Sequence, residues 1–248
     1  MLFRSRMVFL ASSGADQFSN AMAINSNNLA NASTTGFRED FQQLRSMPVF
    51  GDGLPTRVYA MTERPGSNFA NGPINQTGRD LDVAVQGQGW LAVQGGNGAE
   101  GYTRTGSLHL SAEGLLQTSA GLPVLGNGGP ITIPPAEKFN IGADGTISFK
   151  PLGADTENLV VLDRIKLVDP DTALLEKGND GLFRQNNGQL AEPDNNVKLI
   201  SGALEGSNVN VIESMVNMIE LSRLYEMKMK MLKTAEEIDE SAASMMQV

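Results

Sequence analysis

Residues 25–41 read NSNNLANASTTGFREDF, and this stretch separates a helical pattern from an irregular one. Apolar residues before it recur at spacings of three and four, which predicts an amphipathic helix within residues 1–36. Asn and Ser side chains bond to nearby backbone groups and so compete with the helix. Because Gly36 reaches positive φ at no steric cost, we expect the helix to end near this residue.

The composition indicates a folded protein with many turns. The chain has 248 residues, of which 40% are hydrophobic and only 6% aromatic, with 27 Gly and 11 Pro. This favours thin cores and short strands over a doubly wound α/β enzyme. The length admits one large domain or two small ones.

The charge excludes two classes of partner. The net charge is -9 and the pI is near 4.7. Nucleic-acid binding depends on clustered Lys and Arg that release counterions, and no such cluster occurs, so we expect no nucleic acid partner. Anionic membranes are disfavoured likewise, and no apolar run approaches the roughly 18 residues of a membrane span, so we expect no membrane insertion. Without Cys, the chain has no disulfide and no thiolate nucleophile.

The N-terminal residues resemble a signal peptide only superficially. Two arginines precede the apolar run Met7–Ala11. This run is shorter than the roughly 7 to 15 residues of a signal-peptide core, and the helical pattern continues past it. We therefore expect no cleavage after this run.

The C-terminal residues 203–248 contain a second amphipathic helix. Two seams run along it at spacings of four and three, offset by three residues. The first comprises Val211, Met215, Met218, Ser222, Tyr225, Met229 and Leu232, and the second Leu221, Leu224, Lys228, Met231, Ala235 and Ile238. Two seams exceed what one helix partner requires, so we expect contacts with the N-terminal helix and with helices of other subunits. The alternative is a broad core-facing stripe of an ordinary globular helix.

The middle of the chain has the pattern of a β-domain. Residues 37–74 are broken by Pro and Gly, which predicts an extended connector with one strand at 56–61. Short apolar runs between turn dipeptides then predict an antiparallel, sandwich- or barrel-like domain over residues 75–202. The predicted strands are 80–85, 90–93, 102–110, 115–118, 123–125, 131–133, 138–141, 146–150 and 160–168. The expected fold is a mainly β central domain flanked by two α-helices that pair as a coiled-coil-like stalk.

The candidate catalytic and ligand-binding patterns are not specific. His109, the only histidine, lies in a strand-like alternation without the partners of a triad or a zinc site. Gly87–Ala92 formally matches a dinucleotide fingerprint, but a strand and not a helix follows it. Asp80 and Asp82 are predicted to share one face of a strand, either as an acid–base pair or as solvated neighbours. We expect no cofactor, no metal and no small-molecule substrate.

Four stretches of the sequence carry a resemblance to a known family, and we call them the family words. They are SNNLAN at 26–31 with TGF at 35–37, DVAVQGQGW at 82–90, GYTRTGS at 101–107 and LEGSNVN at 204–210. Together they resemble the flagellar axial proteins, the family of rod, hook and hook-associated subunits. Asn and Ser in the last word are also good helix N-caps. The chain length, RDLD at 79–82 and GGPITIP at 128–134 are most similar to the proximal-rod type, with the distal-rod type second.

The resemblance implies a structural subunit and not an enzyme. It implies export through the flagellar export apparatus without a cleaved signal peptide. It also implies polymerisation in the periplasm, with copies of itself and with other rod subunits, into the rod that passes motor torque to the hook. Because the terminal helices have wide apolar faces and few internal partners, we expect them to become fully ordered only on assembly. The expected assembly interface comprises Asn28, Leu29, Ala30, Asn31, Gly36, Phe37, Ser207, Asn208, Val209, Asn210, Met215, Met218, Leu221, Leu224, Tyr225, Met229 and Leu232.

Other functions stay open from the sequence. One is a carbohydrate-active β-domain that uses Asp80 and Asp82. Another is a monomeric binding module whose helices pack only on each other. Within the family, the alternative is a distal-rod or hook-type axial subunit.

Overall fold

The computed structural model describes residues 4–42, 44–48, 58–62, 66–151 and 159–245. The chain forms two compact units. The helical unit comprises the described parts of 1–32, 39–68 and 209–248, and the β unit comprises 33–38 and the described parts of 69–208. Each unit is therefore built from segments that lie far apart in the sequence.

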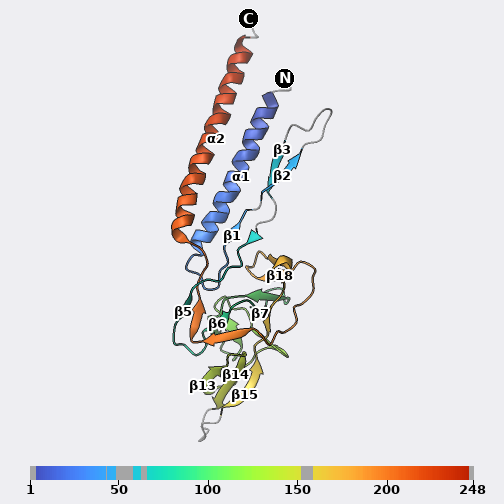
Figure 1. Cartoon of the computed structure of the whole chain (residues 1–248), viewed down its shortest axis with the longest axis vertical. Coiled ribbons are helices and arrows are strands. Elements are labelled where there is room, and N and C mark those ends of the chain that lie inside the picture. Colours follow the sequence, from blue (N-terminus) through green and yellow to red (C-terminus); the bar gives the residue numbers. More distant parts are fainter. Residues whose placement is uncertain (1–3, 43, 49–57, 63–65, 152–158, 246–248) are drawn as a thin grey trace. The chain divides into compact units, whose positions relative to one another are not determined.

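Two helices lie side by side in the helical unit (Figure 1). α1 spans Arg4–Ala30 and α2 spans Val211–Met245, and they run antiparallel, so both predicted helices are confirmed. The Asn25 side-chain amide donates to the Ser214 carbonyl oxygen at 2.7 Å, which fixes the faces that meet. A Cβ on Gly14 would lie 3.7 Å from Cε of Lys228, so the lysine stem packs where α1 has no side chain.

The shielded face of α2 combines residues of both predicted seams. Buried or half-buried residues recur at spacings of four and three, namely Ser214, Met218, Leu221, Tyr225, Lys228, Leu232 and Ala235, and Ser222 and Leu224 beside them are also half-buried. Met215 and Met229 of the first seam and Met231 of the second are exposed. Apolar character alone does not select this face, because a serine and a lysine lie on it toward α1.

α1 ends before the predicted exit at Gly36. After Ala30, the Asn31 backbone amide donates to the carbonyl oxygens of Asn27 and Asn28, both at 3.1 Å. The Asn31 side-chain amide donates to Asn27 at 2.9 Å, which satisfies a carbonyl at the helix end. Gly36 has the expected positive φ, 70°, but it belongs to the β unit and does not cap the helix.

Two short ribbons complete the described part of the helical unit. β1 (Asp40–Phe41) pairs antiparallel with β4 (Gly66–Ser67). β2 (Leu44–Pro48) pairs antiparallel with β3 (Val58–Thr62). β3 corresponds to the strand predicted at 56–61, of which residues 56 and 57 lie outside the described residues.

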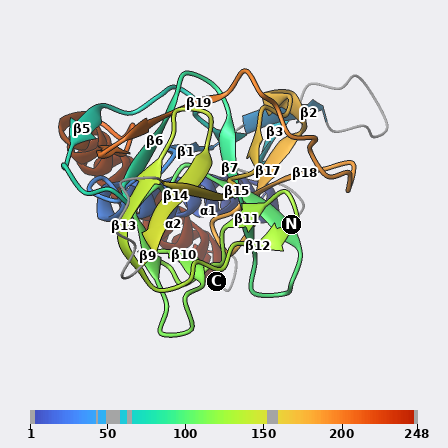
Figure 2. The same ribbon diagram turned by 90° about the horizontal axis from the view of Figure 1, so that it is seen from below.

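The β unit consists of antiparallel sheets and ribbons (Figures 1 and 2). The largest sheet among the described residues has the order β16-β7-β8-β18-β17, with bounds Leu167–Val168, Trp90–Gln94, Glu100–Thr103, Phe183–Gln185 and Leu175–Lys177. A second sheet has the order β13-β14-β15, with bounds Ala136–Ile141, Thr146–Pro151 and Val160–Arg164. A 3-10 turn at Thr172–Leu174 precedes β17.

Four two-stranded pairings surround these sheets. β6 (Val83–Gln86) pairs with β19 (Lys198–Ser201), and β5 (Ile74–Gln76) pairs with β20 (Ala203–Glu205). β9 (Leu108–Leu110) pairs with β10 (Leu116–Thr118), and β11 (Leu125–Gly126) pairs with β12 (Gly129–Pro130). Every described pairing is antiparallel, as the sequence predicts.

β7 lies in the middle of the core. Leu91 and Val93 belong to one apolar cluster, and Trp90 and Ala92 belong to another. Because successive side chains of a strand point to opposite faces, β7 is buried on both sides. The first cluster also includes Leu116 and residues of β6, β9, β14 and β19, so it joins several sheets.

Several predicted strands need correction. The strand predicted at 102–110 is interrupted at 104–107, and the one predicted at 160–168 is interrupted at 165–166. The strand predicted at 80–85 begins only at Val83, because Asp80 and Leu81 lie in a turn. The pattern also does not predict β5, β17, β18, β19 and β20. Polar and charged residues in these short strands hide the period of two.

Leu116→Ala tests the core. Leu116 is 0% exposed, so its truncation leaves a cavity in the core. This cavity is expected to lower the free energy of unfolding of the β unit. A loss of about 2–5 kcal/mol is typical of this substitution. The measurement is urea denaturation followed by the fluorescence of Trp90, the only tryptophan.

The matched control is Leu190→Ala, because Leu190 is 64% exposed. A change below about 0.5 kcal/mol is expected there. Equal losses in the two variants would contradict the assignment of Leu116 to the core.

Candidate functional site: a buried ionic clasp

Three segments of the β unit adjoin the helical unit along the chain: residues 33–38, 69–73 and 203–208. The Gly36 amide donates to the Glu205 carbonyl oxygen at 2.8 Å. The Gly206 amide donates to the Pro73 carbonyl oxygen, also at 2.8 Å. The C-terminal segment therefore bonds to both of the others.

The Glu205 side chain connects these segments. Its Oε1 lies 2.8 Å from Arg38 Nη2 and accepts from the Gly72 amide at 3.0 Å. Its Oε2 lies 3.0 Å from Arg104 Nη1. The side chains of Arg38, Arg104 and Glu205 are 0%, 3% and 2% exposed, and we call these three residues the clasp. A buried charge is tolerated only when it is paired and hydrogen-bonded, and one carboxylate here serves two guanidinium groups.

Arg104 also fixes the turn between β6 and β7. Its Nη1 and Nη2 donate to the carbonyl oxygens of Val85 and Gly87 at 3.4 and 2.7 Å. Burial lowers the pKa of Arg104, and the charge of Glu205 acts in the opposite direction. The guanidinium nevertheless stays protonated.

Arg38 has fewer partners than Arg104. Besides Glu205, its Nη2 donates to Asn71 Oδ1 at 3.2 Å. Nε and Nη1 of Arg38 are buried without a hydrogen-bond partner among the described residues, as is Nε of Arg104. Within that part of the chain, Glu205 is the ion-pair partner on which Arg38 depends.

Aromatic rings cover the clasp. The Trp90 ring centroid lies 5.3 Å from Cζ of Arg104 and 5.9 Å from Cζ of Arg38. Phe69 and Phe183 pack on Trp90 at centroid distances of 6.0 and 4.7 Å. Guanidinium groups over an indole ring are attracted by its quadrupole, so Trp90 stabilises both cations.

Gly36 lies against the backbone of Arg104, where a side chain has no room. Its φ is 70°, and a Cβ would lie 2.3 Å from the carbonyl carbon of Arg104. The next residue, Phe37, has the Nζ of Lys177 4.1 Å from its ring centroid. The TGF word therefore packs closely inside the β unit.

Asparagines of the family words bond within the helical unit. The buried Asn28 donates through its side-chain amide to the Asp40 carbonyl oxygen at 2.7 Å, and its Oδ1 accepts from the Asp40 amide at 2.9 Å. This pair of bonds holds β1 as a neighbouring strand would. The Asn210 side chain accepts from the amides of Ile212 and Glu213 at 3.2 and 3.4 Å, which confirms the expected N-cap of α2.

The predicted interface residues differ in exposure. The buried ones are Asn28, Gly36, Ser207 and Val209. The half-buried ones are Leu29, Asn31, Phe37, Asn208, Met218, Leu221, Leu224, Tyr225 and Leu232. The exposed ones are Ala30, Asn210, Met215 and Met229.

The sequence does not predict the clasp, although its members stand in or beside the family words. Arg38 follows TGF, Arg104 is the charged residue of GYTRTGS, and Glu205 is that of LEGSNVN. A lone charge in its family word is a signal for Arg104 and Glu205 but not for Arg38, which Glu39 and Asp40 follow directly. The separation of 101 residues between Arg104 and Glu205 conceals their pairing.

Asp80 and Asp82 do not form the predicted pair on a strand. Asp80 is exposed in a turn, whereas Asp82 is buried. Thr77 Oγ1 donates to Asp82 Oδ2 at 2.7 Å, and Asp82 Oδ1 lies 3.5 Å from Arg79 Nη1. The Asp82 carboxylate therefore stabilises this turn. His109 lies on β9, as predicted, and no group of metal-binding side chains occurs among the described residues.

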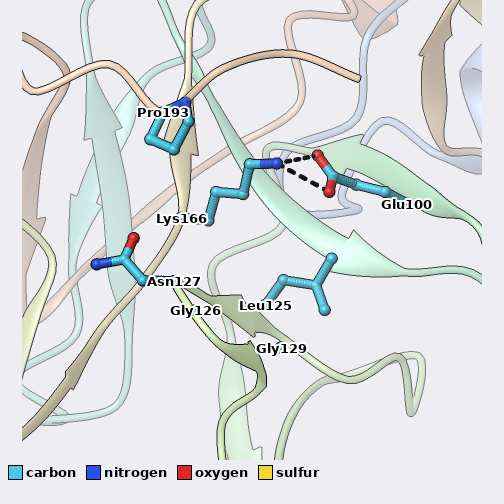
Figure 3. Close-up of a pocket in the computed structure, with 7 residues that line it drawn as sticks. All are labelled: Glu100, Leu125, Gly126, Asn127, Gly129, Lys166 and Pro193. Carbon is cyan, nitrogen blue, oxygen red and sulfur yellow. Dashed lines mark hydrogen bonds and ion pairs between the residues drawn. The ribbon is translucent and has the colours of Figure 1, made fainter. Parts of the chain in front are cut away.

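A small pocket lies elsewhere in the β unit (Figure 3). It has a volume of about 240 Å³ and is lined by Glu100, Leu125, Gly126, Asn127, Gly129, Lys166 and Pro193. Lys166 Nζ bonds to both carboxylate oxygens of Glu100 at 2.8 and 2.9 Å. The two charges neutralise each other, so the pair presents no net charge to a ligand. The described helices contain no stretch with the length and apolar character that a membrane crossing requires.

Three family models match separate parts of the chain. The flagella basal body rod protein model matches residues 10–38. The flagellar hook protein FlgE/F/G D1 domain matches 84–149, and the flagellar basal body rod FlgEFG protein C-terminal model matches 200–245. Each matched region contributes one member of the clasp.

Curated relatives match over nearly the whole chain. The flagellar basal-body rod protein FlgF of Salmonella typhimurium is 41% identical over 236 residues, which cover 93% of this chain and 94% of the relative. The chain belongs to the flagellar basal-body rod protein family. FlgF of Caulobacter vibrioides is 35% identical over 87% of each chain, and FlgG of Bacillus subtilis is 30% identical over 94% of this chain and 96% of the relative.

Family membership confirms the resemblance seen in the sequence. Both types of relative expected there are found, and the FlgF relatives just described are more similar to this chain than the FlgG relative. All are named as rod proteins, which supports a structural role and not an enzymatic one.

Gly36→Ala tests the close passage at the clasp. The new Cβ meets the Arg104 backbone and also requires an unfavourable φ, so a loss of more than about 2 kcal/mol from the β unit is expected. The control is Gly78→Ala, which has a similar φ of 73° but no atom within 4 Å. Only backbone strain of about 1 kcal/mol is expected there. Equal losses in urea denaturation would contradict steric exclusion at Gly36.

Asn28→Asp tests the bonds to β1. The carboxylate cannot donate to the Asp40 carbonyl oxygen, so the helical unit is expected to lose about 1–3 kcal/mol. Asn27→Asp introduces the same charge at an exposed neighbour and serves as the control. The measurement is thermal unfolding followed by helical circular dichroism. A greater loss in the control would show that charge, and not the lost donor, is responsible.

Proposed function

We propose that this chain is a structural subunit of the flagellar rod that polymerises through its two terminal helices. Its partners in this proposal are copies of itself and other rod subunits. The subunit passes through the flagellar export apparatus without signal-peptide cleavage and assembles in the periplasm. The resulting rod transmits motor torque to the hook. Family membership supports the rod assignment.

The observation that carries this proposal is an exposed apolar face on α2. Its four members follow the spacing i, i+3, i+4 and i+7, and we call them the outer face. They are Ile212, Met215, Val216 and Ile219, which are 76%, 52%, 58% and 55% exposed. None of them belongs to the shielded face of α2. A contiguous apolar face in water is typical of a protein interaction surface.

The size of the outer face favours a polymer over a stable dimer. Burial contributes roughly 25 cal/mol per Å² of apolar surface. Four side chains supply less than the about 800 Å² per partner found in stable complexes. Each contact is therefore expected to be weak alone. Such contacts become sufficient when every subunit touches several neighbours.

The helix pair has features that fit ordering on assembly. Ser214 and Lys228 lie on the shielded face of α2, and Asn25 of α1 bonds to the Ser214 carbonyl oxygen. These polar groups bury less apolar area than leucines would, and so offset less of the entropy lost on ordering. We infer that the coiled-coil-like stalk becomes fully ordered when neighbouring subunits cover the outer face.

Two alternatives differ in how they would use the terminal helices and the outer face. A distal-rod type of subunit, for which the similarity to FlgG is the weaker support, would use the same helices at another position in the rod. A monomeric binding module would have no need of the outer face for assembly. The turn that contains Asp80 and Asp82 gives no support to a carbohydrate-active enzyme.

Val216→Asp tests the outer face in cells that carry this chain as their only copy. A charge placed in a buried contact is expected to weaken it by about 100-fold, or about 3 kcal/mol. Rods should then arrest, which electron microscopy of purified basal bodies measures, and swimming should be lost. The control Asn217→Asp adds the same charge at the next residue, which is polar and exposed. Complete rods with Val216→Asp would contradict this interface, provided that both variants are exported equally.

A further inference from the structure

We propose that Glu205 controls the docking of residues 33–38 on the rest of the β unit, because Arg38 remains buried near Arg104 only while the Glu205 carboxylate bonds to both. The segment 33–38 therefore stays docked only while Glu205 is charged, whereas residues 203–206 keep their backbone pairing with residues 73–76. This inference concerns the closure of a single chain and does not depend on rod assembly.

Arg38 and Arg104 are like charges that Glu205 holds close together. Both guanidinium groups are buried, bond to the same carboxylate and lie within 6 Å of the Trp90 ring centroid. Burial and the charge of Arg38 each lower the pKa of Arg104, whereas Glu205 raises it. The exposed Asp169 acts in the same direction as Glu205 but more weakly. Without Glu205, two like charges would face each other in a site closed to water.

The two arginines differ in the hydrogen bonds that remain when Glu205 is removed. When Glu205 is removed, Arg104 keeps its hydrogen bonds to the carbonyl oxygens of Val85 and Gly87. Among the described residues, the Arg38 side chain keeps one hydrogen bond, to Asn71, besides its contact with the Trp90 ring, and two of its nitrogens already have no partner. Hydration outside the β unit satisfies the Arg38 guanidinium better than this site does without Glu205. The segment that carries Arg38 is therefore the one released.

The side-chain and backbone bonds of Glu205 are coupled. The carbonyl oxygen of Glu205 accepts from the Gly36 amide, and its Oε1 accepts from the Gly72 amide. The Asn208 amide donates to the Phe37 carbonyl oxygen at 3.4 Å. Release of residues 33–38 breaks the bonds at Gly36 and Phe37 together, so closure is cooperative.

The open state retains the apolar core. Neither the cluster that contains Leu91 and Leu116 nor the one that contains Trp90 includes a residue of segment 33–38. A chain that lacks only the Glu205 charge therefore keeps its sheets and loses the docking of one segment. This selective effect distinguishes control of docking from general loss of stability.

Glu205→Gln tests the proposal in the full chain. Hydrogen exchange of the Gly36 amide should accelerate by about 100-fold, because a buried cation loses its charged partner. Exchange of the Leu116 amide, which donates to Ile131 in the core, should stay unchanged. Unchanged exchange at Gly36 would overturn the proposal.

Arg38→Met in the Glu205→Gln background separates charge repulsion from simple loss of a bond. Removal of the second cation should restore part of the protection at Gly36, because Arg104 alone keeps its carbonyl partners. Protection that is equal to or lower than in Glu205→Gln would overturn the proposal. A control outside the clasp is Lys166→Met with Glu100→Gln, which removes another ion pair of the β unit and should leave Gly36 unchanged.

Arg38→Met alone keeps the proposal testable if Glu205→Gln does not fold. It leaves Arg104 and Glu205 as a paired cation and anion, so the β unit should fold, and Gly36 should lose about tenfold in protection or less. Failure of this variant to fold, or hydrogen exchange of the Gly36 amide that is about 100-fold faster, would overturn the inference that Arg38 is the cation left unpaired without Glu205.

Discussion

Two buried guanidinium groups require a buried anion, and the β unit meets this requirement with one residue. Glu205 bonds to Arg38 and Arg104 through its side chain, to the Gly72 amide through the same carboxylate, and to the Gly36 amide through its carbonyl oxygen. The aromatic cover over the cations and the absence of a side chain at position 36 follow from the same arrangement. The family models match one region around each charged member, so the three regions by which the family is recognised meet at a single ionic contact.

The two units differ in how they are stabilised. The β unit has an apolar core on both faces of β7, which is enough to hold short strands of mixed composition together. The helical unit places a serine and a lysine on the face where α2 meets α1, while apolar side chains of α2 stay in water. This distribution is expected of a subunit that completes part of its packing with neighbours. Amide groups of Asn25 and Asn28 give the helical unit a defined geometry without much apolar burial.

The sequence predicts those features that have a local physical cause. The period of the apolar residues predicts both helices, and Asn210 is identifiable as an N-cap from its side chain alone. Features set by distant residues are not predictable in this way. Gly36 takes positive φ as expected, but the lack of room for a side chain there comes from the Arg104 backbone, which is far away in the chain. The sequence suggests that Asp82 pairs with Asp80, whereas in the structure Thr77 donates to its carboxylate. The charged residues of the clasp lie far apart in the sequence, and no periodic pattern relates them.

The pairing of the entering and leaving segments determines where mechanical tension acts. Residues 36 and 37 bond to residues 205 and 208, so the chain is tied together close to the points where it enters and leaves the β unit. A pull on the two ends of this unit is resisted first by these bonds and by the ion pairs of Glu205. The strands between residues 74 and 201 lie off that load path. The pull instead reaches this part of the unit through Arg104, whose guanidinium group pairs with Glu205.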